Sequence, residues 1–112
     1  DSQNPRLLFI KGTSAVYIPP QFGGGIDEAS QLFTRAITYF RTQNSTEGKQ
    51  LPKWGFDEAY LWLGMLKSLS GEQGDAISAL TKSLEISDNI WVKNTLIPTL
   101  KRGESIAQYF GL

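Results

Sequence analysis

The most regular hydrophobic pattern in the chain lies within residues 56–90. Its first part has apolar residues at helical spacing, with larger ones at the shoulders of the same stripe: Ala59, Leu63 and Leu66, then Tyr60, Trp62 and Leu69. Its second part repeats this spacing at Ala76, Ile77, Leu80 and Leu84. Asp57 stands at an N-cap position, and Gly71 stands where a left-handed C-cap glycine is expected. The pattern predicts two amphipathic helices joined by a tight turn.

The N-terminal part of the chain contains two further helical patterns. Asn4 followed by Pro5 is a typical helix start, and the apolar residues that follow predict a helix that runs to about Ile18. Residues 19–20 are both proline and end this helix, because proline lacks an amide donor and restricts the residue before it. A second helix is predicted over residues 26–42.

The remaining segments connect and cover these helices. Residues 43–53 are polar and predict a loop, after which at least one of Trp54 and Phe56 is expected to be buried against the first two helices. Either of residues 88–89 suits an N-cap, and the apolar residues that follow predict a further helix. Pro98 falls inside that pattern and is expected to kink or split the helix.

A glycine-rich loop at residues 19–25 separates the first two predicted helices. Such a loop before a helix can bind phosphate through its backbone amides. Here no Gly-Lys-Ser/Thr sequence follows, and the carboxylates of Asp27 and Glu28 would repel an anion. We therefore expect a structural loop that turns tightly over the helix pair and places Phe22 in the core.

The pattern within residues 56–90 resembles the tetratricopeptide repeat, which has a period of about 34 residues. The signature positions of the first repeat helix are occupied by Tyr60, Leu63, Gly64 and Lys67, and the later ones by Ala76, Leu80, Ser83 and Asp88. Lys67 replaces an aromatic residue of the signature, and Asp88 replaces its proline. The resemblance implies that Gly64 and Ala76 form the small pair at which the two helices cross.

A stretched copy of the same signature lies upstream. It matches at Leu8, Lys11, Gly12 and Ala15, and then at Ala29, Phe33 and Ala36, with the extra length in the loop at residues 19–25. The resemblance implies a single all-α domain over residues 1–112, a right-handed stack of antiparallel helix hairpins with about five to six helices. Its parts would be a degenerate repeat at residues 4–42, a second repeat at residues 55–88 and C-terminal capping helices at residues 89–112.

Composition narrows the classes of partner and compartment. A length of 112 residues suits one domain that buries roughly two thirds of its unfolded surface. The charges balance at 11 basic and 11 acidic residues, so we expect neither nucleic acid nor a membrane surface as the partner. No apolar run approaches the roughly 20 residues of a membrane span. Because the chain begins with Asp1, we expect a fragment or a processed form.

The residue types argue against catalysis and against a cofactor. The sequence has no His and no Cys, which excludes Ser-His-Asp and Cys-His arrangements and thiolate metal sites. The acidic pairs at residues 27–28 and 57–58 stand at predicted helix starts, where they interact favourably with the helix dipole. No loop has the spacing of calcium ligands. We therefore expect a protein without enzymatic activity, metal or cofactor.

The resemblance implies a binding groove on the first helix of each repeat. Carried over by position, the groove would be lined by Arg6, Phe9, Thr13, Tyr17, Glu58, Leu61, Met65 and Leu69. Such a mixed surface suits a protein or peptide partner. The loop at residues 19–25 is similar to one in a subset of bacterial repeat proteins, which implies a bacterial protein of the cytoplasm or the periplasm.

Three alternatives remain open at this point. Two repeat copies make a short groove, which the C-terminal helix would then simply fill. A structural role is the second alternative, in which Tyr109 and Phe110 pack on another copy of the chain or on a neighbouring domain. A small-ligand pocket between Tyr17, Phe22 and Trp54 is the third.

Overall fold

The computed structural model describes residues 4–47 and 54–112. These residues form helices and no strands, so the predicted all-α class is confirmed. In chain order the elements are α1 (Pro5–Val16), the 3₁₀ helix η1 (Pro20–Phe22), α2 (Ile26–Glu47), α3 (Phe56–Leu69), α4 (Gln73–Ile86), the π-helical turn η2 (Val92–Leu96), α5 (Ile97–Lys101) and the 3₁₀ helix η3 (Ala107–Phe110). Within the described ranges, no helix combines the length and the apolar character needed to cross a membrane.

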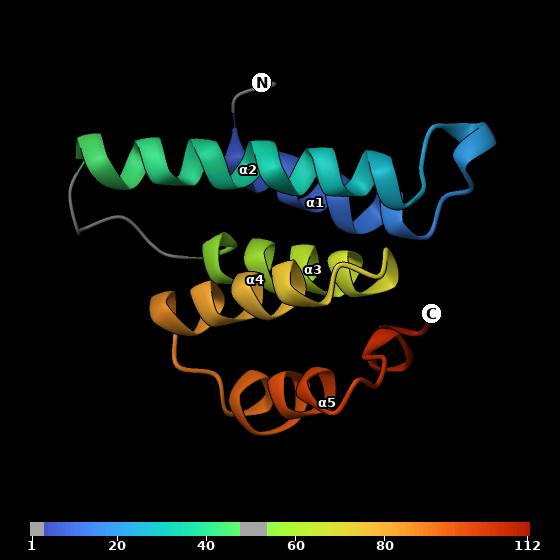
Figure 1. Ribbon diagram of the computed structural model, residues 1–112. Helices are drawn as coiled ribbons and strands as arrows, with labels where there is room; N and C mark the ends of the chain where they lie inside the picture. The colour runs from blue at the N-terminus through green and yellow to red at the C-terminus, as the bar shows by residue number, and fades with distance from the viewer. Residues whose placement is uncertain (1–3, 48–53) are drawn as a thin grey trace.

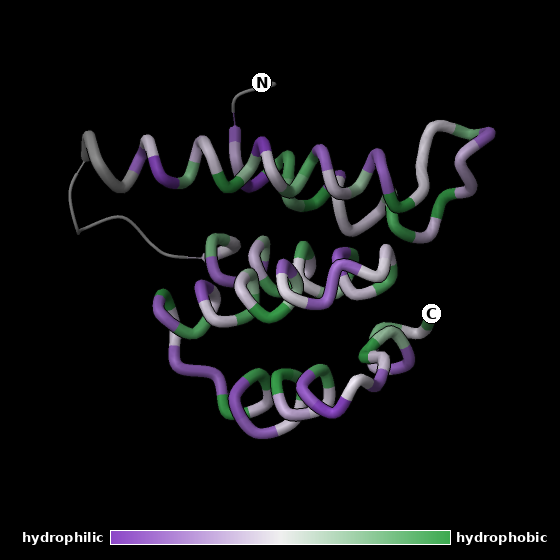
Figure 2. Tube along the Cα trace, in the orientation of Figure 1, coloured by the Kyte–Doolittle hydropathy of each residue, from purple (hydrophilic) through white to green (hydrophobic). Residues whose placement is uncertain are grey.

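The helices are arranged in three layers (Figure 1). Helices α1 and α2 form an antiparallel hairpin, α3 and α4 form a second hairpin beneath it, and α5 with η2 packs against α4. The 3₁₀ helix η3 then returns to contact α3. Hydrophobic positions concentrate where one layer faces the next, whereas the outer side of α2 and the connection after α4 are largely hydrophilic (Figure 2). A right-handed superhelical twist stays a prediction.

Each hairpin has a glycine where its two helices approach closely. A Cβ atom added at Gly12 would lie 2.8 Å from Cε1 of Phe33. In the second hairpin a Cβ atom at Gly64 would lie 3.0 Å from Leu80 and 3.1 Å from the carbonyl oxygen of Ala76. The expected close approach of Gly64 and Ala76 is therefore confirmed.

Helices α1 and α3 begin in different ways. The side chain of Asn4 accepts hydrogen bonds from the amides of Arg6 and Leu7 at the start of α1, as predicted. The predicted N-cap Asp57 is wrong, because Gly55 occupies that position with a left-handed backbone at φ 91°. The Gly55 amide donates to Oε1 of Glu58 at 2.9 Å, which ties the start of α3 to its own first turn.

The turn between α3 and α4 follows the prediction for Gly71. Its backbone is left-handed, with φ 78°. The Gly71 amide donates to the carbonyl of Ser68, and the Glu72 amide donates to the carbonyl of Lys67. These two bonds satisfy carbonyl groups at the helix end. They reverse the chain within the three residues that separate α3 from α4, which allows α4 to pack directly on α3.

The longer connection between α1 and α2 closes through its backbone and not through Phe22. The amide of Gly25 donates to the carbonyl of Ala15 at 2.8 Å, and a Cβ atom at Gly24 would lie 2.3 Å from the carbonyl oxygen of Ile18. Phe22 ends the turn η1 with 75 % of its surface exposed, so the prediction that it lies in the core is wrong.

The predicted boundary of the second helix is also wrong. Helix α2 continues past residue 42 to Glu47, because no proline or glycine occurs between residues 43 and 47 to end it. Residues 48–53 of the predicted loop lie outside the described part of the chain. The expectation for the next segment is confirmed, since Phe56 is buried and its ring stacks on Phe40 of α2 at 5.4 Å between centroids.

The C-terminal helix contains the predicted irregularity near Pro98. Asn89 caps its start through Oδ1, which accepts from the amides of Trp91 and Val92. The backbone then widens into the π-helical turn η2, in which the amide of Ile97 donates to the carbonyl of Val92, five residues earlier. A widened turn accommodates the missing donor and the ring of Pro98 without ending the helical segment.

Candidate functional site

The predicted groove residues lie on one face of α1 and α3, but they do not form an open groove. Leu61 and Met65 are buried, with 7 % and 0 % of their surfaces exposed, so Met65 offers a partner no accessible surface and Leu61 offers little. The reason is that the C-terminal segment returns to α3 and packs against it. Of the other six, Tyr17 is exposed, whereas Arg6, Phe9, Thr13, Glu58 and Leu69 are partly exposed.

At one end of this face, Trp54 contacts two of the predicted groove residues, Arg6 and Phe9. Its ring meets the ring of Phe9 edge-on, with 6.1 Å between centroids. The guanidinium of Arg6 lies 6.0 Å from the centroid of Trp54 and 5.4 Å from that of Phe40. Arg6 is therefore held between two aromatic rings, an arrangement that stabilises the cation without burying it.

At the other end, the C-terminal segment contributes the aromatic ring that covers α3. Phe110 meets Trp62 of α3 at 5.1 Å between centroids, and it contacts Trp91 at 5.8 Å. The hydroxyl of Tyr17 donates to the backbone carbonyl of Phe110 at 2.5 Å. Segments that are distant in sequence thus converge here: the end of α1, the middle of α3, the start of the C-terminal helical region and η3.

A pocket of about 500 Å³ lies at this convergence, and we call it the aromatic pocket. Its lining residues are Tyr17, Glu58, Leu61, Trp62, Asn89, Trp91, Tyr109 and Phe110. Three of these were predicted as groove residues: Tyr17, Glu58 and Leu61. The volume falls within the usual range for small-ligand and side-chain pockets.

Five lining residues were not assigned to the groove from the sequence. Trp62 directly follows the predicted Leu61, so its place on α3 was within reach of the helical pattern. Trp91, Tyr109 and Phe110 come from the segment interpreted as a cap. The alternative in which the C-terminal helix fills the groove placed this segment near the first helices, but it named none of these three residues as lining. The available signal was the adjacent aromatic pair Tyr109 and Phe110 near the end of the chain.

The carboxyl groups of Asp57 and Glu58 supply the negative charge near the aromatic pocket. The pKa of Asp57 is raised from 3.8 to about 6, first by partial burial and then by the hydrogen bond and the charge of Glu58. The two carboxyl groups interact directly, since one can donate a hydrogen bond to the other while it is protonated. Near neutral pH this corner of the pocket carries negative charge.

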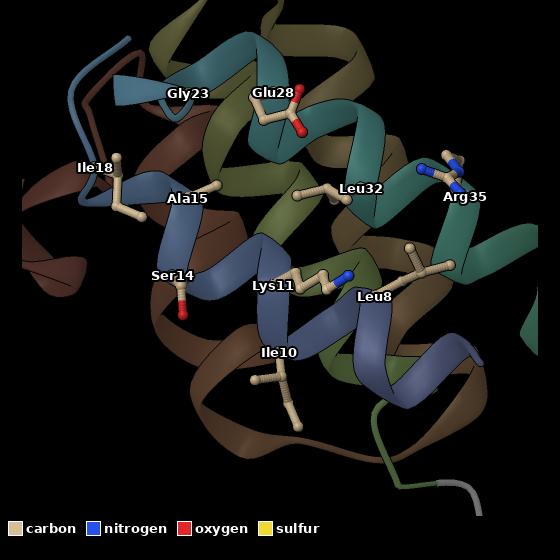
Figure 3. Close-up of a pocket in the computed structure, with 10 residues that line it drawn as sticks. All are labelled: Leu8, Ile10, Lys11, Ser14, Ala15, Ile18, Gly23, Glu28, Leu32 and Arg35. Atoms are coloured by element: carbon tan, nitrogen blue, oxygen red, sulfur yellow. The ribbon is translucent and has the colours of Figure 1, made fainter. Parts of the chain in front are cut away.

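Other grooves also occur on the described surface, and the two described next do not point to one ligand chemistry. The groove between α1 and α2 measures about 470 Å³ and combines an apolar floor with charges of both signs at Lys11, Glu28 and Arg35 (Figure 3). The other, about 790 Å³, lies beside the loop at residues 19–25 and is mainly apolar, with Leu69 and Leu112 among its lining residues.

The small-ligand hypothesis that joined Tyr17, Phe22 and Trp54 is corrected. Trp54 packs on Phe9 near the start of α1, whereas Tyr17 follows the end of that helix and packs on Trp62. Phe22 is exposed on the connecting loop. The three residues therefore line no common pocket.

Neither a metal-binding group nor a similar protein indicates a function for the described residues. Within residues 4–47 and 54–112, His, Cys, Asp and Glu residues form no group of three or more that is placed to hold a metal ion. No protein-family model matches the sequence, no curated protein matches it, and no solved structure matches it.

Proposed function

We propose that this chain is a non-catalytic interaction module of the tetratricopeptide type, which binds a peptide segment of a partner protein on the face made by α1, α3 and η3. The observation that carries the proposal is the aromatic pocket, where rings from four segments surround a hollow on this face. Aromatic residues are the commonest anchors of protein interfaces, because they bury much surface at little cost in conformational entropy.

The two glycine contacts support the tetratricopeptide assignment. Gly12 and Gly64 hold equivalent positions in the two signature copies, and each faces the large residue of its own copy, Phe33 or Leu80. A stack of such hairpins presents the first helix of each pair on one face, which is where Tyr17 and Glu58 lie. The absence of His and Cys from the sequence agrees with a role in binding without catalysis.

The C-terminal segment shows how a chain segment lies on this face. The 3₁₀ helix η3 places Phe110 against Trp62 and Trp91, and its carbonyl accepts from the hydroxyl of Tyr17. A partner peptide would lie beside this segment and insert one side chain into the aromatic pocket. Self-association through Tyr109 and Phe110 is less well supported, since Phe110 packs on its own chain.

A peptide-display selection against the folded protein tests the proposal. We expect enriched peptides that share one fixed position and bind with dissociation constants of roughly 1–100 µM. The Trp91→Ala variant removes a ring from the pocket and should weaken this binding about tenfold or more. The Phe22→Ala variant removes an exposed ring outside the pocket and serves as the matched control.

Two outcomes would contradict the proposed function. One is a selection that enriches no binding peptide. The other is a set of peptides that bind the wild-type protein and the Trp91→Ala variant equally well, because such peptides would use another surface. Circular dichroism of both variants shows that a loss of binding does not come from unfolding.

A further inference from the structure

The aromatic pocket presents rings from several directions. Tyr17, Trp91 and Tyr109 are each exposed over 39–54 % of their surface, so their rings remain accessible. Tyr17 stands at 87° to Trp62, and Trp91 stands at 90° to Tyr109. These pairs are edge-to-face contacts, and an aromatic face that stays accessible carries partial negative charge that attracts a positively charged guest.

The charge of the pocket favours a cation. Among the described lining residues, Glu58 is the charged one, and neither Lys nor Arg lines the pocket. The carboxyl group of Asp57 lies beside Glu58 and interacts with it. A guest with a positive charge therefore gains attraction from the carboxylates and from the rings, whereas an anion is repelled by both.

Three polar atoms of the pocket already have hydrogen-bond partners within the chain. The Tyr17 hydroxyl donates to Phe110, Oδ1 of Asn89 accepts from two backbone amides, and Oε1 of Glu58 accepts from Gly55. A primary ammonium or a guanidinium group loses water on binding and needs acceptors to replace it. A quaternary ammonium group has no N–H and needs none.

We infer that the aromatic pocket binds a quaternary ammonium group, a nitrogen cation whose substituents are methyl or alkyl groups. This inference rests on the proposed function and names the chemistry of the group that the partner inserts. The same chemistry occurs in a free small molecule such as choline and in a trimethylated lysine side chain. The pocket recognises the cation in both, and separate arms of the experiment distinguish the two sources.

The first arm compares choline with its neutral isostere 3,3-dimethylbutan-1-ol, in which carbon replaces the nitrogen. Binding is followed by isothermal titration calorimetry and by tryptophan fluorescence of the wild-type protein. We expect choline to bind about tenfold or more tightly than the isostere, because only the cation gains from rings and carboxylates. Equal affinity of the two compounds would overturn the inference, and so would the absence of binding by every quaternary ammonium tested.

The second arm titrates a short peptide that carries trimethyllysine and the same peptide with unmodified lysine. Tighter binding of the methylated peptide than of choline identifies a peptide source, and the reverse order identifies a free small molecule. Either order supports a site for a quaternary ammonium group. Preference for unmodified lysine would overturn the inference, because it would show that hydrogen bonding dominates recognition.

Variants locate the site. Trp91→Leu keeps apolar bulk but removes a ring, and Glu58→Gln keeps an acceptor for the Gly55 amide but removes the charge. We expect each to weaken choline binding roughly fivefold or more. Phe22→Ala and Glu85→Gln change an exposed ring and an exposed carboxylate outside the pocket, and they should leave binding unchanged. Loss of binding in these controls alone would place the cation elsewhere and overturn the inference.

The two proposals can fail separately. Display-selected peptides that need Trp91, together with no binding of choline or the trimethyllysine peptide, would leave the interaction face in place and overturn the cation inference. Binding of choline that depends on Trp91 and Glu58, together with an empty peptide selection, would support the cation site and contradict the proposed protein partner.

Discussion

Each of the two helix hairpins has a glycine in close contact with a large side chain, but only in the first hairpin does that side chain also pack on the other hairpin. In the second hairpin Gly64 accommodates Leu80 and the backbone of Ala76. In the first hairpin Gly12 accommodates the ring of Phe33, which also stacks on Trp62 of α3 at 6.0 Å between centroids. The glycine of the first hairpin therefore helps to position the ring that joins the two hairpins.

The starts of α2 and α3 offer a second comparison within the same hairpins. Residues 26–29 read Ile-Asp-Glu-Ala and residues 56–59 read Phe-Asp-Glu-Ala. The first acidic pair is exposed, whereas the second is partly buried beside the aromatic pocket. The same local sequence thus has a different electrostatic environment in each hairpin, because the surrounding layers differ.

Truncation of the two large signature residues should give the largest effect. Phe33→Ala is expected to lower the free energy of unfolding by about 4 kcal/mol, and Leu80→Ala by about 3 kcal/mol. Both side chains are fully buried, but loss of the Phe33 ring also removes a contact with Trp62. Urea denaturation measures both values. A larger cost for Leu80→Ala would show that the contact between hairpins adds little stability.

Alanine substitutions at the two glycines should have the next largest effect on stability, and the cost should differ between the two hairpins. Gly12→Ala is expected to cost about 2 kcal/mol, because the new Cβ atom overlaps a buried ring and the gain in helix propensity only partly compensates. Gly64→Ala is expected to cost less than about 1 kcal/mol, since its contacts are longer. Thermal unfolding of both variants tests this order, and the reverse order would contradict the comparison.

The partly buried acidic pair should make stability depend on pH. The pKa of Asp57 is raised from 3.8 to about 6 in the folded state by burial and by Glu58, so the folded protein binds this proton more tightly than the unfolded chain does. The contribution of Asp57 to the free energy of unfolding therefore falls as the pH rises from about 4 to about 6. Above pH 6 the penalty is fully present.

The Asp57→Asn variant removes this penalty. Its stability relative to the wild-type protein should rise by about 1 kcal/mol between pH 4 and pH 7, a value reduced to allow for partial solvent screening. Asp27→Asn at the matching position of α2 serves as the exposed control. Denaturation curves at several pH values measure the difference, and a relative stability of Asp57→Asn that does not change with pH would rule out the proposed cause.

The smallest effect is expected in the loop that distinguishes the first hairpin. Phe22 is exposed, so Phe22→Ala should change the free energy of unfolding by no more than about 0.5 kcal/mol. A loss well above 1 kcal/mol in urea denaturation would indicate that the ring packs on the chain in solution. This measurement also verifies the control variant used for the binding experiments.

Much of the fold was predictable because its signals are local. Helical spacing of apolar residues identified the four main helices, and Asn4, Gly71 and the residues before the C-terminal helix marked their limits. The errors at Asp57 and Phe22 have a common cause. In both places a glycine in an unusual backbone conformation, Gly55 or the glycines after residue 22, determined the local path, and the side-chain pattern did not reveal it.

Less of the site was predictable. The predicted groove contains three of the residues that line the pocket: Tyr17, Glu58 and Leu61. Their positions along the first helix of each hairpin follow from helical spacing. Trp91 joins them after α4, and Phe110 joins them only after the chain has also passed through η2 and α5 and returned to α3. Each of those steps adds an orientation that the sequence pattern does not specify.

The sequence alone determined that this protein is all-α, that its helices pair as hairpins, and that Gly12 and Gly64 stand at positions where large side chains would not fit. Only the tertiary structure decided which apolar residues of α1 and α3 remain exposed. An amphipathic pattern identifies the face of a helix that is buried, but it does not identify the residues that pack against that face. Trp54 and Phe110 take that role here through contacts distant in sequence, which depend on how the layers pack.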